Sequence, residues 1–156
     1  MATDADVLKT IVDAFAACPR PDQFYDNPTH CDECAEHDAL LRSRALDELS
    51  IDDLGSPAWD PIPGVSDAAF AYLVPALARL ALDPPHAKWG WYGPQLLTHL
   101  ERDGRRNTRW AHCTPEQHDA VAALLEHIID TRVELLERNF CDHQAFRVLE
   151  IWRERT

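Results

Sequence analysis

An apolar segment occupies residues 67–82 and reads DAAFAYLVPALARLAL. Ser66 precedes it directly and is a favourable helix N-cap residue. Apolar side chains occur on nearly every side of this segment, and a helix that is apolar all round has to be buried inside a protein. We therefore predict a central buried helix, which the rest of the chain must cover.

The other apolar residues recur mostly at helical spacing, and the period-two alternation that half-buried strands require is missing. Proline, glycine and N-cap signals divide the chain into predicted helices at about residues 4–17, from Thr29 or His30 onwards, at 50–54, from about Pro94 to Gly104, from Thr114 to about Arg138, and after Asn139. The sequence thus predicts an all-α protein, a single domain over residues 1–156 folded as an irregular bundle of about five to six helices.

Acidic residues dominate the charge of the chain. There are 27 Asp and Glu against 15 Lys and Arg, a formal net charge of −12. Such a charge repels phosphate backbones and anionic lipid surfaces, so we expect neither nucleic acid nor membrane as a partner. A basic protein partner or a cationic ligand fits this charge better, and the sequence leaves the oligomeric state open.

The N-terminal residues are acidic where a secretory signal would be basic, and no apolar run is long enough to span a membrane. We therefore expect a cytoplasmic protein. The cysteines, at positions 18, 31, 34, 113 and 141, are expected to be thiols or metal ligands, because structural disulfides are rare in that compartment.

One short run could carry chemistry, namely HCDECAEH at residues 30–37. Cys31 and Cys34 have the two-residue separation at which two thiolates chelate one zinc or iron ion, and His37 follows after two further residues. On a regular helix Cys31, Cys34 and Asp38 fall within an arc of about 60°, as do His30, Cys34 and His37, so these side chains can converge. We predict a metal site with Cys31, Cys34 and His37 as ligands and with zinc favoured over iron.

One segment rarely supplies four ligands to a tetrahedral ion, so a complete site needs a residue from elsewhere. Cys113, just before the long helix, is the preferred fourth ligand. His112, His86 and His30 are the alternatives, and a second Cys-x-x-Cys pair is absent from the chain.

Two other interpretations compete with metal binding. Cys34 could pack beneath Leu41 as a small apolar residue while His30, Cys31 and His37 face solvent. Alternatively, cysteines in the first turn of a helix could act as reactive thiols. Neighbouring acids should raise a thiol pKa, and the strand that leads into the helix of familiar redox proteins is missing, so thiol chemistry is the least favoured interpretation.

Other polar and aromatic groups have simpler explanations. The acids along residues 119–137 have the spacing of a solvated helix face, and the Glu-x-x-His motif of ferritin-like iron sites is absent. Arginines at 102, 105, 106 and 109 are expected to be solvated. Trp89, Trp91 and Tyr92 are expected to anchor an irregular loop, with a pocket as the alternative. No recognisable catalytic constellation occurs, so enzymatic activity is left undecided.

Several stretches together also carry a resemblance: CPRPDQF, THCDECAEHDALLRS, a connector ending in AWDP, SDAAFAYLVPALARLAL and, more weakly, TPEQHDAVAALLEHI. They resemble a family of small uncharacterised bacterial proteins, mainly over residues 11–82. The resemblance implies a helical fold and a role for the cysteine run, and it implies no activity or substrate.

The favoured hypothesis is therefore a small metal-binding helical protein, with zinc as its cofactor. The alternative is an acidic interaction module, such as an inhibitor or an immunity protein, which covers a basic partner and needs no metal.

Overall fold

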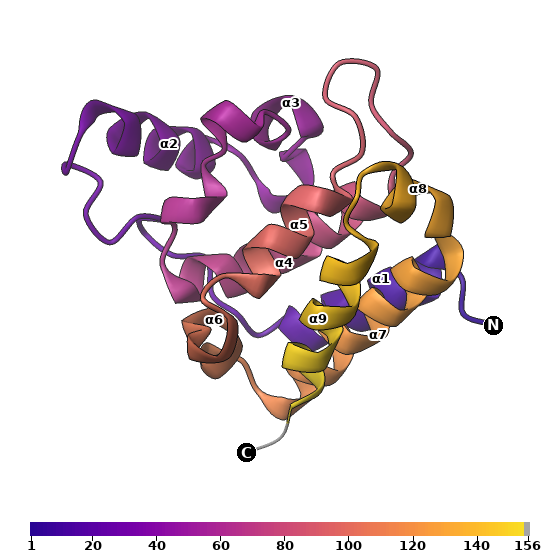
Figure 1. The fold of residues 1–156 in the computed structure, drawn as a ribbon. Helices are drawn as coiled ribbons and strands as arrows, with labels where there is room; N and C mark the ends of the chain where they lie inside the picture. Colours follow the sequence, from indigo (N-terminus) through magenta and orange to yellow (C-terminus); the bar gives the residue numbers. More distant parts are fainter. Residues whose placement is uncertain (155–156) are drawn as a thin grey trace.

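The computed structural model is all-α, as predicted (Figure 1). It describes residues 1–154, except for the side chain of Arg105. Within this part of the chain there are nine α-helices and four short 3₁₀ helices, so the prediction of five to six helices was too low. The α-helices are α1 (Asp4–Phe15), α2 (Asp32–Ser43), α3 (Ile51–Leu54), α4 (Asp67–Leu82), α5 (Gly93–Glu101), α6 (Thr108–His112), α7 (Pro115–Thr131), α8 (Val133–Arg138) and α9 (Asp142–Arg153).

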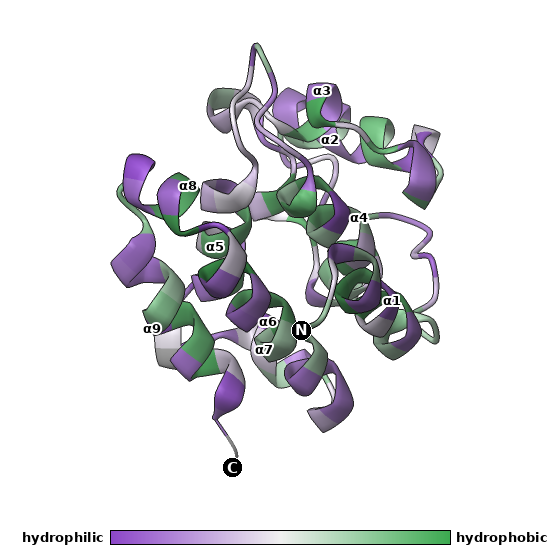
Figure 2. Cartoon of the chain, turned by 90° about the vertical axis from the view of Figure 1, so that its right-hand side faces the viewer, coloured by the Kyte–Doolittle hydropathy of each residue, from purple (hydrophilic) through white to green (hydrophobic). Residues whose placement is uncertain are grey.

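Helix α4 is the central helix of the bundle, as its composition predicted. Eleven of its sixteen residues are buried. Helices α1, α5 and α6 pack against it, and α7 packs between α1 and α9. Both ribbon views place α2 and α3 on the side of α4 away from α7 and α9, and Figure 2 shows hydrophobic and hydrophilic residues alternating along the helices. The buried apolar residues of the described chain form one continuous core.

Local start signals place several helices where the sequence predicted them. Thr3 caps α1 in a capping box with Asp6, and Thr114 does the same for α7 with Gln117. The hydroxyl of Ser66 accepts a hydrogen bond from the N–H of Ala69 at the start of α4. These contacts lie within four residues of one another, which is why sequence alone could locate them.

Three helix boundaries differ from the prediction. The long helix stops at Thr131, because Arg132 leaves the helical conformation (φ −128°, ψ 38°) and its guanidinium binds the carboxylate of Asp4 and the carbonyl of Leu82. Helix α5 ends at Glu101 instead of Gly104, since Arg102 adopts a positive φ of 33°. Helix α2 begins at Asp32, later than the predicted Thr29 or His30.

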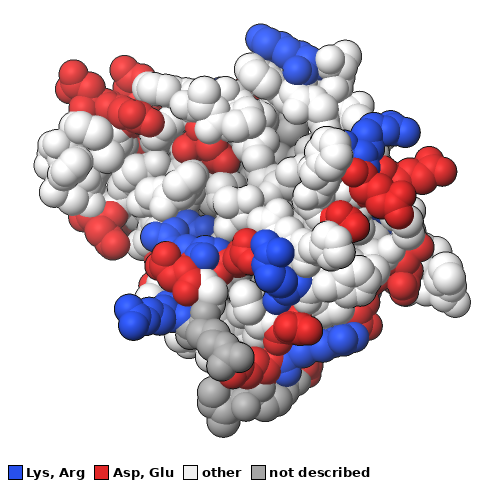
Figure 3. Space-filling view, viewed as in Figure 1, with Lys and Arg blue, Asp and Glu red and all other residues white. Residues whose placement is uncertain are grey.

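The surface carries many acidic groups. Figure 3 shows acidic side chains over α2 on the face toward the viewer. No helix among the described residues combines the length and the apolar character needed to cross a membrane.

Candidate metal centre

His30, Cys31 and Cys34 meet where the chain enters α2. Cys31 is the N-cap residue, with extended backbone angles (φ −158°, ψ 170°), and its sulfur accepts a hydrogen bond from the N–H of Cys34 at 3.3 Å. Thr29, one of the two predicted starts of this helix, lies before it and donates its hydroxyl to the side chain of Asn27. The sulfur of Cys31 therefore caps the first turn of α2, and this hydrogen bond brings the two cysteine side chains together.

The ligand atoms of these three residues all lie within 4.8 Å of one another. The two sulfurs are 3.1 Å apart, and Cys34 Sγ is 3.9 Å from His30 Nδ1. In a tetrahedral zinc site with Zn–S bonds of about 2.3 Å, two sulfurs lie about 3.8 Å apart and a sulfur and a nitrogen about 3.6 Å apart. The three side chains therefore fit a shared zinc ion after shifts below about 1 Å.

The two thiols have different electrostatic surroundings. The pKa of Cys31 is lowered to about 7, by the backbone N–H of Cys34 first, then by the Cys34 side chain and by His30. The pKa of Cys34 is raised, by its contact with Cys31, by burial and by the charges of Cys31 and Glu33. The neighbouring acids were expected to raise the thiol pKa, but the pKa of Cys31 is lowered, and the hydrogen bond from the amide at the helix N-terminus is the largest cause.

His37, a predicted ligand, lies outside this close group. It is buried (3% exposed), its Nε2 is 3.2 Å from Glu33 Oε1, and its ring packs against Trp59 with the centroids 4.7 Å apart. Its Nδ1 is buried without a hydrogen-bond partner among the described residues. His30 is the histidine that the structure brings to the two cysteines, although it precedes the helix on whose face it was placed.

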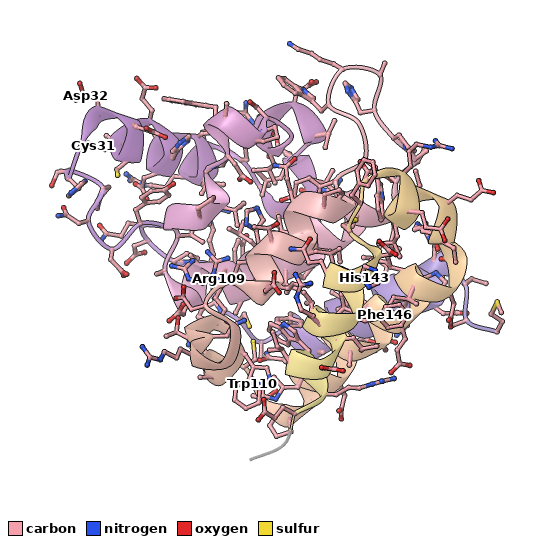
Figure 4. All side chains as sticks on the ribbon, viewed as in Figure 1. Cys31, Asp32, Arg109, Trp110, His143 and Phe146 are labelled. Carbon is pink, nitrogen blue, oxygen red and sulfur yellow. The ribbon has the colours of Figure 1, made fainter. Side chains whose placement is uncertain are left out.

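Cys113, the preferred fourth ligand, is also remote from the group. It follows α6 as its C-cap and is buried, and burial raises the pKa of its thiol to about 12. Figure 4 shows Cys31 at the outer end of α2, across the molecule from Trp110 of α6. The other two candidates are apart as well: His112 ends α6, and His86 accepts hydrogen bonds from the N–H groups of Lys88 and Trp89. The fourth position therefore has no ligand among the described residues.

Asp38 joins α2 to the loop that precedes it. Helical spacing placed it on the same face as Cys31 and Cys34, but the sequence did not predict this bracing role. It is buried (3% exposed), and its Oδ1 accepts hydrogen bonds from the N–H groups of Phe24 (2.7 Å) and Tyr25 (3.1 Å). The Arg20 guanidinium reaches over to the carbonyl of Arg42 at 2.9 Å. These contacts tie the loop that carries His30 to α2. An acid on the core-facing side of a helix, next to Leu41, was the available sequence signal.

The arginine cluster differs from its prediction. Arg109 is 1% exposed and donates to the carbonyls of His99 and Ile62, so it braces the core and is not solvated. Arg102 and Arg106 are exposed as expected, and the side chain of Arg105 lies outside the described part.

The aromatic loop anchors itself as predicted and also borders a cavity. Trp91 is buried and donates its indole N–H to the carbonyl of Ala81 at 2.8 Å. Tyr92 lines a cavity of about 380 Å³ together with Ile51, Leu80 and the loop around His86. The Tyr92 hydroxyl is buried without a hydrogen-bond partner among the described residues.

Comparisons with protein-family models, with curated proteins and with solved structures find no match to this chain. The family resemblance of residues 11–82 therefore stays a prediction. Among the described residues, His30, Cys31 and Cys34 form the group of side chains that could hold a metal ion.

Proposed function

We propose that this protein binds a zinc ion through Cys31, Cys34 and His30. The observation that carries the proposal is the convergence of their three ligand atoms within 4.8 Å. Thiolate and imidazole are the ligands that zinc prefers, and a two-residue cysteine separation on the first turn of a helix is a common way to present two of them. Iron takes the same donors but is the less favoured ion.

The proposed site is open. His30 and Cys31 are exposed, and the described residues supply no fourth ligand. Structural zinc sites are closed by four protein ligands, whereas sites that act on or pass on the metal keep one position for water or for another molecule. An open site at the outer end of α2 favours exchange of the ion with a partner over a purely structural role.

A second candidate function is the binding of a basic protein, as the net charge suggested. Asp32, Glu33 and Glu36 are exposed on α2 beside the cysteines. Acidic side chains around an exposed site attract a basic partner and hold a cation nearby. We place this protein in the cytoplasm, where thiol ligands stay reduced.

Metal content tests the first proposal. The protein is purified without a metal-binding tag, and bound elements are measured by inductively coupled plasma mass spectrometry. We expect about one zinc per chain, lost in a Cys31→Ser/Cys34→Ser double variant. Cys18→Ser and His143→Ala are matched controls, because Cys18 contacts Gln117 and His143 is a fully solvated histidine on α9.

Cobalt substitution gives a second readout of the ligands. Cobalt bound by two thiolates absorbs through sulfur-to-metal charge transfer, and this band should fall in each cysteine variant and shift in His30→Ala. A wild-type protein that takes up neither zinc nor cobalt rejects the metal proposal. In that case the acidic surface is tested by adding a basic protein to wild type and to the double variant, which should bind it equally.

A further inference from the structure

The sulfurs of Cys31 and Cys34 lie between two bonding arrangements. At 3.1 Å they are closer than the roughly 3.8 Å of two thiolates on zinc. A disulfide needs about 2.05 Å, so the two sulfurs must approach by about 1 Å. The separation is therefore as compatible with an S–S bond as with a shared ion.

The two cysteines are also unequally accessible. Cys31 is exposed at the end of α2, and its sulfur receives the N–H of Cys34. Cys34 is half-buried behind it and packs against the core. In thiol–disulfide exchange, the attacking thiol has to meet the substrate, while the resolving thiol has to reach only the mixed disulfide. Cys31 fits the first role and Cys34 the second.

We propose that the metal-free Cys31 and Cys34 pair exchanges with disulfides, and that it prefers cationic ones. The Cys31 thiolate attacks one sulfur of the substrate, whose S–S bond breaks, and the first thiol leaves with a proton from solvent. Cys34 then loses its proton and attacks Cys31 Sγ, expelling the second thiol. The protein gives up two electrons and two protons, and one substrate disulfide becomes two thiols.

The preference for cations follows from the surroundings of the pair. Asp32, Glu33 and Glu36 are exposed around it, and the chain carries a net charge of −12. A like-charged substrate such as glutathione disulfide is repelled, whereas a disulfide with positive groups is attracted. A disulfide within a basic peptide or protein should therefore be attracted in the same way as a small cationic disulfide.

This activity goes beyond the proposed zinc site and does not depend on it. Both use the same thiolates, so a bound ion and the disulfide exclude one another. Oxidation would leave His30 alone, and one imidazole does not retain zinc.

The test uses the reduced full-length protein, freed of metal with a chelator. It is mixed with cystamine, with hydroxyethyl disulfide or with glutathione disulfide, which are cationic, neutral and anionic respectively. Mass spectrometry follows the loss of two hydrogens or the gain of a mixed-disulfide adduct. We expect an intramolecular Cys31–Cys34 disulfide, formed at least about tenfold faster with cystamine than with glutathione disulfide.

Variants assign the two roles. Cys34→Ser should stop at a mixed disulfide on Cys31, and Cys31→Ser should react slowly, while Cys18→Ser behaves as wild type. Asp32→Asn/Glu36→Gln should reduce the difference between the reaction rates with cystamine and with glutathione disulfide. Added salt should narrow it in wild type as well.

The proposal is overturned if both thiols survive cystamine, if wild type stops at the mixed disulfide, or if the three disulfides react at equal rates. Zinc titration of the same reduced sample separates the two proposals. A sample that forms the disulfide without binding zinc rejects only the metal site, and one that binds zinc without forming the disulfide rejects only the exchange activity.

Discussion

The Oδ1 atom of Asp38 lies 2.7 Å from the backbone nitrogen of Phe24, and this contact joins the loop before the cysteines to the helix after them. Both groups are buried, so water cannot replace the bond. The position of His30 relative to Cys34 therefore depends on a carboxylate that takes no part in the close group.

Asp38→Ala should destabilise the protein by about 2–3 kcal/mol, because it leaves two buried N–H groups without an acceptor. Urea unfolding measures the change. Asp22→Ala, at an exposed acid of the same loop, is the control and should stay within about 0.5 kcal/mol of wild type. An equal stability of the two variants would show that Asp38 does not hold the loop.

His30→Ala should weaken zinc binding at least tenfold, since even residues behind the ligands typically contribute about 10–100-fold to metal affinity. His37→Ala should leave zinc affinity nearly unchanged and reduce stability instead, because its ring packs between Tyr25 and Trp59. Competition with a chromophoric chelator measures the affinities. A larger loss of zinc affinity in His37→Ala than in His30→Ala would make His37 the ligand.

Cys31 should be the first thiol alkylated by limiting iodoacetamide in the metal-free protein. Its pKa is lowered to about 7, so its rate should reach half its maximum near pH 7, while Cys34, whose pKa is raised, reacts only at higher pH. Peptide mass spectrometry across a pH series gives both curves. His30→Ala should move the Cys31 curve to higher pH, and a wild-type midpoint near pH 9 would contradict the geometry of the N-cap.

Asp4 should make the stability of the folded protein depend on pH in the acidic range. Hydrogen bonds from Arg132 and then from His127 lower its pKa from 3.8 to about 2. A carboxyl whose pKa is lower in the folded state stabilises the fold above the unfolded pKa and loses that contribution as the pH falls through the folded pKa. Thermal unfolding of wild type and Asp4→Asn should therefore differ above pH 4 and converge toward pH 2. The expected difference in unfolding temperature is modest, since the Asp4 side chain is 52% exposed and solvent screens its charge. A difference that persisted unchanged at pH 2 would mean that the pair does not act through ionisation.

Sequence patterns located the elements whose causes are local. The caps at Thr3, Ser66 and Thr114 each act on a residue three positions further along, and the apolar content of α4 requires burial wherever the helix is placed. The meeting of Cys31 and Cys34 is local too, because one helical turn separates them. The all-α fold and the cysteine pair were predictable for this reason.

Contacts between residues far apart in the sequence determined the features that local signals could not predict. Arg132 ends the long helix through Asp4, which lies 128 residues earlier, and no local signal marks that break. The His37 ring packs against Trp59 and Tyr25, and so it lies apart from the cysteines. His30 lies beside them because the backbone is extended at Cys31. Cys113 is buried at the end of α6, away from the other predicted ligands. The sequence determined which residues are able to bind a metal, and tertiary packing determined which of them meet, because burial and long-range hydrogen bonds set the direction of each side chain.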